Sequence, residues 1–303
     1  MIGLKIYSVP KNIEDFFEKI KSINVDTLFI SKEVYSSKEF VFTLKIRKIT
    51  FYCIFQVFYN PSYLKVNPSA YSITERGEKA IDEWVHFVCP SDNKYKEYLI
   101  GEVAYITEQI KPTGISLDFI RQFIFWEKVH DVSSERLIKS CKCPRCRDKS
   151  PSKEITNTVK LFSSFIKKSQ PDCIIGLHSV PWKEGEFNNG LLEIAGQDLN
   201  KLGSYVDFIS PMCYSHMLKK EPNWINQVVK DHKNRSQISV IPAVQVKECY
   251  LSNKLNKSEL KEIIIESIKK PSGGIILWSW DYIVDSEIYN WLNVEFRDLF
   301  FDI

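Results

Sequence analysis

Residues 114–120 read GISLDFI, a short apolar run that a single carboxylate interrupts. The run is rich in β-branched residues and stays apolar at successive positions, with little polar alternation. This pattern is typical of strands buried on both faces, as in a parallel sheet that helices cover. Seven similar runs predict further strands, at 4–9, 26–31, 51–58, 173–180, 206–214, 238–246 and 273–280.

The segments between these runs have apolar residues three and four positions apart, which is the spacing of amphipathic helices. Pro112, Pro171 and Pro271 each follow such a segment, where proline commonly ends a helix. Eight strands alternating with helices, without a break in composition, predict one α/β domain over residues 1–303, a (β/α)8 TIM barrel. The predicted helices are 12–23, 95–110, 154–168, 191–203, 223–232, 257–270 and 286–300.

Two segments between predicted elements are unusually long. Residues 59–93 follow the third predicted strand, and residues 121–152 follow the fourth. In a barrel, loops after strands lie on the face that carries the active site. We therefore expect both segments to shape a cleft there.

The composition is that of a globular protein, with 44% hydrophobic and 26% charged residues. The 41 basic and 38 acidic residues leave a net charge of only +3. That balance does not indicate nucleic acid or an anionic membrane as a partner. No apolar run reaches the roughly 18 residues of a membrane span. The first residues lack the pattern of a signal peptide, so we expect a cytoplasmic protein, unless a leader has been removed.

Three of the eight cysteines, Cys141, Cys143 and Cys146, form the cluster CKCPRC. Their spacing does not resemble a secreted disulfide framework. A structural zinc site needs four ligands, and the nearest histidine, His130, lies eleven residues upstream. We therefore expect no metal and no other cofactor. The alternatives for the cluster are a zinc site and a loop held by S–H and N–H hydrogen bonds.

Signatures of several other enzyme classes are missing from the sequence. Neither GxGxxG nor GxxxxGK[ST] follows a strand, so an open nucleotide-binding sheet has no support. The first strand has no HxH pair and HExxH does not occur, which argues against a metal hydrolase. There is also no GxSxG elbow for a catalytic serine.

Functional groups of a barrel gather at the carboxyl ends of its strands. Asp118 is the strongest candidate, because a charge inside an apolar strand must be paired or solvated. Its alternatives are an ion pair with Arg121 and a cap on a neighbouring turn. Core packing would also explain His178 or Trp278. The other candidates for substrate binding at these ends are Trp182, Tyr214, His216, Gln245, Glu248, Trp280 and Asp281.

Cleavage of a glycosidic bond needs two carboxyl groups, one to donate a proton and one to support the cationic sugar or activate water. Glu127 follows Asp118 by nine residues and lies between bulky apolar residues in FWEKVH, where desolvation would suit an acid. It could equally be a solvated loop residue. Trp278 and Trp280 alternate along the last strand, so we expect both to face one side and stack on sugar rings. The competing second carboxylates are Glu184, Glu186, Glu248 and Asp281.

Three strands resemble those of barrel glycoside hydrolases related to the chitinases. TGISLDFI (113–120) is similar to the chitinase pattern DGxDxDxE, in which Asp118 matches the last Asp. Ser116 replaces an earlier Asp, and Ile120 stands where the acid Glu should be, so chitinase activity is not implied. Met212 and Tyr214 match a Met-x-Tyr motif, and Trp278 matches the Trp that floors the subsite next to the cleaved bond.

A closer resemblance is to bacterial barrel proteins described as glycosyl hydrolases. It covers the chain from about residue 50 onward, through GISLDFIR (114–121), WE (126–127), CKCPRC (141–146), VPW (180–182) and SPMCYSH (210–216). It implies the reaction class of a glycoside hydrolase. Together with the residues discussed above, it leads us to expect cleavage of a glycosidic bond in an oligo- or polysaccharide, with Asp118 at the reacting centre and Glu127 as the acid. Arg121 would orient Asp118 or bind an anionic sugar group. The alternative is a catalytically inactive barrel that binds a glycan or a protein partner, which Ile120 favours.

Overall fold

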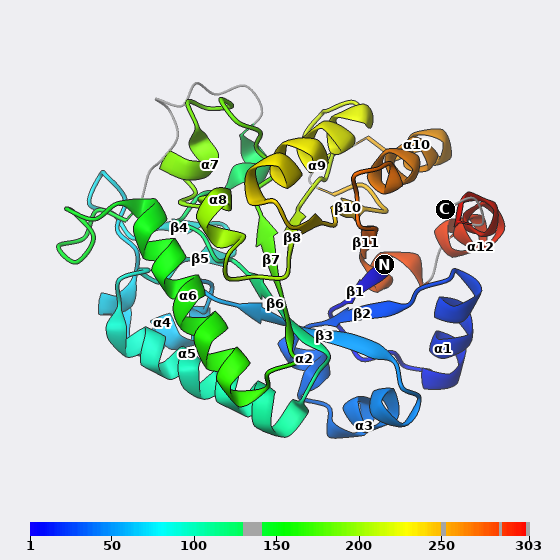
Figure 1. Ribbon diagram of the computed structural model, residues 1–303, viewed down its shortest axis with the longest axis horizontal. Helices are drawn as coiled ribbons and strands as arrows, with labels where there is room; N and C mark the ends of the chain where they lie inside the picture. The colour runs from blue at the N-terminus through cyan, green and yellow to red at the C-terminus, as the bar shows by residue number, and fades with distance from the viewer. Residues whose placement is uncertain (130–140, 250–252, 285–286, 301–303) are drawn as a thin grey trace.

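The computed structural model describes residues 1–129, 141–249, 253–284 and 287–300. Its main sheet runs in the order β10-β11-β1-β2-β3-β6-β7-β8-β9, with all strands parallel. A parallel bridge between Met212, directly after β8, and Ala243 of β10 closes the sheet. Helices surround the strands (Figure 1), and the predicted TIM barrel is confirmed.

All eight predicted strands are present. The seventh is split into β9 and β10 at Pro242, because proline has no N–H for the ladder. The strands are β1 (Ile2–Ile6), β2 (Thr27–Ile30), β3 (Thr50–Gln56), β6 (Gly114–Asp118), β7 (Ile174–Ser179), β8 (Phe208–Pro211), β9 (Ser239–Val240), β10 (Ala243–Gln245) and β11 (Ile275–Trp278).

Six of the seven predicted helices are confirmed. Several begin with a side chain that caps the first turn, as Asn12, Asp92 and Asn256 do. None of the described helices is long and apolar enough to cross a membrane. The confirmed helices are α1 (Ile13–Ser22), α5 (Asn93–Tyr105, continued by a π-helical turn to Ile110), α6 (Pro151–Ser169), α9 (Asn223–Ser236), α10 (Lys257–Ile268) and α12 (Glu287–Phe300).

The prediction of one helix over 191–203 is wrong. Two short helices, α7 (Gly190–Glu193) and α8 (Leu199–Leu202), lie there. Gly196 between them has a φ of +76°, which breaks the helix. The neighbouring Gln197 is drawn inward, where its amide bonds to the backbone of Ile120, His178 and Val180.

The helices α2 (Lys32–Tyr35) and α3 (Lys38–Ile46), between the second and third strands, were not predicted. They have four and nine residues, whereas helical periodicity becomes visible only in longer windows, of roughly 11–18 residues.

Aromatic rings fill the barrel interior at the amino-terminal ends of the strands. Phe29 stacks on Tyr52 with ring centroids 4.9 Å apart, and both meet Phe208 edge-on. Gly114 and Gly176 make room for them, because a Cβ at either position would lie within 2.3 Å of Tyr52 or Phe208. The packed rings close this end, so a cavity can open only at the carboxyl ends of the strands.

Both long insertions lie at that open end. Residues 59–93 form α4 (Pro61–Val66), a 3-10 turn at Pro68–Ala70 and a hairpin of β4 (Ile81–Asp82) and β5 (Val85–His86). Residues 121–152 contain a 3-10 turn at Trp126–Lys128 and a cysteine-rich loop before α6. Because they follow the paired strands β3 and β6, the two insertions are neighbours.

Candidate active site

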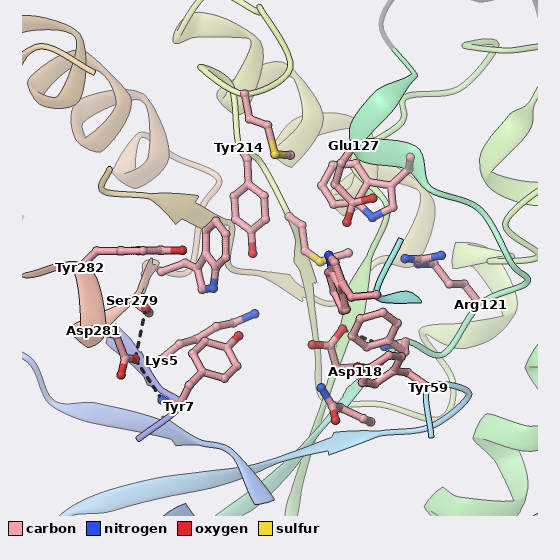
Figure 2. A pocket seen from close by; sticks show the side chains of 17 residues that line it. Lys5, Tyr7, Tyr59, Asp118, Arg121, Glu127, Tyr214, Ser279, Asp281 and Tyr282 are labelled. Carbon is pink, nitrogen blue, oxygen red and sulfur yellow. Dashed lines mark hydrogen bonds between the residues drawn. The ribbon is translucent and has the colours of Figure 1, made fainter. Parts of the chain in front are cut away.

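A cavity of about 430 Å³ opens at the carboxyl ends of the barrel strands (Figure 2). The ends of β1, β3, β6 and β11, the loop after β8 and both insertions contribute to it. Its lining residues are Lys5, Tyr7, Gln56, Tyr59, Trp84, Asp118, Phe119, Arg121, Trp126, Glu127, Met212, Tyr214, Met217, Trp278, Ser279, Asp281 and Tyr282.

Half of the residues predicted for the site line this cavity. They are Asp118, Glu127, Arg121, Tyr214, Trp278 and Asp281. The structure does not bring His178, Trp182, His216, Gln245, Glu248 or Trp280 to its lining. The predicted strand ends therefore lie at the end of the barrel where the cavity opens. They did not indicate which side chains at that end point into the cavity.

The prediction that Trp278 and Trp280 face the same side is wrong. β11 ends at Trp278, and the short helix α11 (Trp280–Ile283) begins two residues later. The alternation of a strand no longer applies, and Trp280 turns into the core, where it packs edge-on against Phe16 at 4.9 Å. Of these two tryptophans, Trp278 lines the cavity and Trp280 does not.

The other predicted residues outside the lining support loops around it. Gln245 accepts a hydrogen bond from the Met217 amide at 2.9 Å and so holds a lining residue. Trp182 is buried against Phe187. Two more have partners elsewhere: His216 bonds to Glu259 Oε1 and the Asn253 carbonyl, and Glu248 accepts from the Leu255 amide.

Asp118 lies at the bottom of the cavity and is only 7% exposed. Burial alone would raise the pKa of its carboxyl group. The charge that His178 gains when it is protonated near pH 3, the charges of Lys5 and Arg121, and the hydrogen bond from the Phe119 amide outweigh burial, and hold the pKa below the usual value. Among the described residues, Arg121 makes no direct ion pair with Asp118. Asp118 is therefore an ionised carboxylate at neutral pH.

Lys5 is a buried lysine of the cavity that was not among the predicted site residues. It is 1% exposed, and its amine and the Asp118 carboxylate point toward one another in Figure 2. Burial lowers the pKa of this amine, while the charge of Asp118 opposes that shift. The signal was available in the sequence, because Lys5 interrupts the apolar run LKIYSV as Asp118 interrupts GISLDFI.

His178, near the end of β7, is buried and does not line the cavity. Its Nε2 is 3.0 Å from the Ser116 hydroxyl, and the ring is 1% exposed. Burial, assisted by the charge of Lys5, lowers the pKa of His178 to about 3, so the imidazole is neutral at physiological pH. At neutral pH His178 is therefore a buried, uncharged ring, close enough to Asp118 for their charges to interact when the ring is protonated.

We expect His178 to make the protein sensitive to acid. A histidine in the unfolded chain titrates near pH 6.5, whereas His178 in the folded protein takes up a proton only near pH 3. Between these values the unfolded chain binds more protons, so the free energy of unfolding falls as the pH is lowered. From pH 6.5 to pH 4.5 this group contributes a loss of about 2–3 kcal/mol. Urea unfolding at both pH values should show a smaller loss for His178→Gln; an equal loss in both proteins would refute the assignment.

Arg121 and Glu127 come from the loop after β6. The Arg121 guanidinium is 2% exposed, lies 5.0 and 5.4 Å from the Phe87 and Phe119 rings, and donates to the Ile124 carbonyl. Burial lowers the pKa of Arg121, and the charge of Glu127 opposes this more strongly than that of Asp118. Arg121 is therefore coupled more closely to Glu127 than to Asp118.

Asp281 serves mainly as a structural link. Its carboxylate accepts hydrogen bonds from the Tyr7 amide, the Ser8 hydroxyl and the Ser279 hydroxyl. These contacts join the end of β1 to the start of α11. With both oxygens engaged, Asp281 is less available for chemistry than Asp118 or Glu127.

Aromatic side chains form two walls of the cavity. On one side Trp278 stacks on Tyr214, with centroids 4.7 Å apart and planes 19° apart, and Tyr282 meets Trp278 edge-on. On the other side Tyr59 stacks on Phe119 at 4.9 Å, and Trp84 packs edge-on against Tyr59 at the mouth. Flat apolar faces with few polar groups between them suit a ring-shaped ligand with C–H faces and hydroxyl edges.

One group of described side chains could hold a metal ion. It consists of Cys89 and the three predicted cysteines Cys141, Cys143 and Cys146. None of the four lines the cavity, so a metal there would not touch a substrate bound beside Asp118. His130 lies outside the described residues.

No protein-family model matches this chain, and no curated protein matches it significantly in sequence. Solved structures do match its fold. A β-galactosidase from the psychrophilic Marinomonas ef1 has a TM-score of 0.73 at 9% identity, over 98% of this chain and 59% of its own. The PgaB (BpsB) glycoside hydrolase domain from Bordetella bronchiseptica has a TM-score of 0.67 at 11% identity, over 97% of this chain and 98% of its own. A β-galactosidase from Rahnella sp. R3 has a TM-score of 0.63 at 12% identity, over 99% of this chain and 55% of its own.

The chain thus spans little more than half of the two β-galactosidases, but nearly all of the PgaB domain. At these identities the likeness is one of fold. The barrel described above is the TIM barrel that these glycoside hydrolases share.

Proposed function

We propose that this protein is a glycoside hydrolase that cleaves an O-glycosidic bond in an oligo- or polysaccharide. One observation carries the proposal: two carboxylates, Asp118 and Glu127, line one aromatic-walled cavity at the carboxyl ends of barrel strands. Figure 2 draws Asp118 in the lower part of the cavity and Glu127 in the upper part. Two carboxyl groups at one sugar are what glycoside cleavage requires.

Asp118 is the carboxylate at the reacting centre, as nucleophile, base or stabiliser. A sugar that loses its leaving group develops positive charge, which a fixed negative charge stabilises. The lowered pKa of Asp118 supports this role, because it keeps the carboxylate ionised during the reaction. Lys5 and the Phe119 amide orient and stabilise that charge.

Glu127 is the proton donor to the leaving oxygen. It follows the fully buried Trp126 and lines the same cavity as Asp118. Arg121, held by the Ile124 carbonyl and two aromatic rings, is a positioning residue for Glu127. Trp278 and Tyr214 provide the stacking surface for the sugar, and Gln56 and Tyr7 are lining residues able to bond its hydroxyls.

The direct test is hydrolysis of a panel of aryl α- and β-glycosides and of oligosaccharides by the purified protein, with detection of released phenol or new reducing ends. We expect release with at least one sugar configuration. If no member of the panel is cleaved while glycans still bind to the cavity, the protein is the inactive binding barrel instead.

We expect Lys5→Met to change the pH dependence of hydrolysis. Lys5 lowers the pKa of Asp118, so removing its charge raises that pKa and makes Asp118 protonate at higher pH. The acid limb of kcat/KM, which reports the free enzyme, should therefore move to higher pH. Lys5→Arg keeps the charge and is the matched control. An unchanged acid limb in Lys5→Met would show that Asp118 does not set it.

A further inference from the structure

Cys89 is the missing fourth member of the CKCPRC cluster. It lies between β5 and α5 in the first insertion, whereas Cys141, Cys143 and Cys146 belong to the second. The ligand atoms of all four lie within 4.8 Å of one another, and no member is more than 6% exposed. A buried group of four sulfur atoms drawn from two loops is the ligand set of a structural zinc site.

The sulfur spacing fits a tetrahedral metal better than a disulfide. With Zn–S distances of about 2.3 Å, tetrahedral geometry separates the sulfurs by roughly 3.8 Å. Cys89 Sγ lies 3.5 Å from Cys143 Sγ and 3.3 Å from Cys146 Sγ. A disulfide would need about 2.0 Å, and all eight cysteines are free thiols.

The surrounding backbone is arranged to support thiolate ligands. The Ile73 amide donates to Cys141 Sγ at 3.2 Å. Cys143 and Cys146 are joined by a tight turn, in which the Cys146 and Arg147 amides both donate to the Cys143 carbonyl. Donors that orient the ligands in this way stabilise a bound metal.

We propose that Cys89, Cys141, Cys143 and Cys146 bind one zinc ion that cross-links the two insertions at the barrel mouth. With four protein ligands the site is closed, so the ion has a structural role and no open position for water or substrate. The same two loops are already in contact, through the bond from the Lys142 amide to the Ile73 carbonyl and the Arg145–Asp92 ion pair.

The cross-link also bears on the cavity. Phe87, two residues before Cys89, packs against Phe119 and Phe123 and carries the Arg121 guanidinium on its ring. Trp84, at the mouth, lies on the same hairpin. The zinc ion would therefore fix one wall of the cavity through Phe87. The binding of the metal does not depend on the proposed hydrolase activity. The effect of the metal on the cavity wall, in contrast, is relevant to that activity.

Metal analysis tests the site directly. Protein purified under reducing conditions without chelators should contain one zinc ion per chain, as measured by elemental mass spectrometry. Cys89→Ser should lose most of it and melt at a lower temperature. Cys173→Ser is the matched control, because Cys173 is also buried but lies outside the cluster, and this variant should keep its zinc.

A second measurement covers the case in which Cys89→Ser does not fold. Removing the metal from the wild-type protein with a chelator should lower its melting temperature, and added zinc should restore it. Cobalt added in place of zinc should give the absorption bands of a tetrahedral thiolate complex. The proposal is overturned if the reduced wild-type protein contains no zinc, takes up neither metal, and melts at the same temperature with and without zinc.

Discussion

Asp118→Asn is expected to reduce kcat by roughly 10²–10⁴-fold on every substrate the protein cleaves. The substitution keeps the size of the side chain but removes the negative charge at the bottom of the cavity, where the sugar becomes cationic. The Phe119 amide can still bond to the amide oxygen, so the fold should persist. Measured rates on aryl glycosides and oligosaccharides, with glycan binding followed in parallel, test this.

The matched control is Asp207→Asn. Asp207 precedes β8, pairs with Lys167 and accepts from the Ile175 amide, so it lies at the closed end of the barrel. We expect the control to retain full activity. An Asp118→Asn protein that is folded and as active as the wild type would exclude Asp118 from the reaction and leave the proposed site without its centre.

The inactive alternative depends on Ile120. A chitinase-like acid would stand at that position, but Ile120 is fully buried, and its carbonyl accepts from Gln197. A carboxylate there would enter packed core. Glu127, seven residues later, reaches the cavity from the loop instead. Loss of the expected acid at one position therefore does not leave the cavity with a single carboxylate.

The fold could be predicted because buried parallel strands leave a continuous apolar signal that needs no knowledge of contacts. A charged residue inside such an apolar run stands out in the sequence, which is how Asp118 was identified. Lys5 would have been identified in the same way if every charged residue within a predicted strand had been given equal weight. Inward and outward positions at strand ends were harder to separate. Trp280 shows why: the strand stops two residues before it, and the chain enters a helix with a different periodicity.

Other parts of the site depend on contacts that no local pattern encodes. Cys89 is 54 residues from Cys143, and only the pairing of β3 with β6 brings their loops together. Gln245 is a polar residue at a strand end, as expected of a residue that binds a substrate. Its side-chain oxygen, however, already accepts a hydrogen bond from the Met217 amide. Residue type and position predict candidates, whereas hydrogen-bond partners decide which of them remain free for a substrate.

Glu127→Ala is expected to separate substrates by their leaving groups. Without its proton donor, the enzyme should cleave unactivated oligosaccharides roughly 10²–10⁴-fold more slowly. Dinitrophenyl glycosides should be affected far less in the step that breaks the glycosidic bond, because their phenolate leaves without a proton. The basic limb of the pH profile, which reports loss of the acid's proton, should disappear as well.

Glu248→Gln and Asp281→Asn distinguish Glu127 from its rivals. Glu248 lies outside the cavity lining and accepts from the Leu255 amide, so its substitution should change neither substrate class. Asp281 lines the cavity but is engaged by Tyr7, Ser8 and Ser279, so its loss should lower stability without selecting between leaving groups. If either variant showed the leaving-group dependence and Glu127→Ala did not, the acid would be that residue. The acid would then come from the segment after β11 or from the loop after β10, and the loop after β6 would contribute only to the cavity wall.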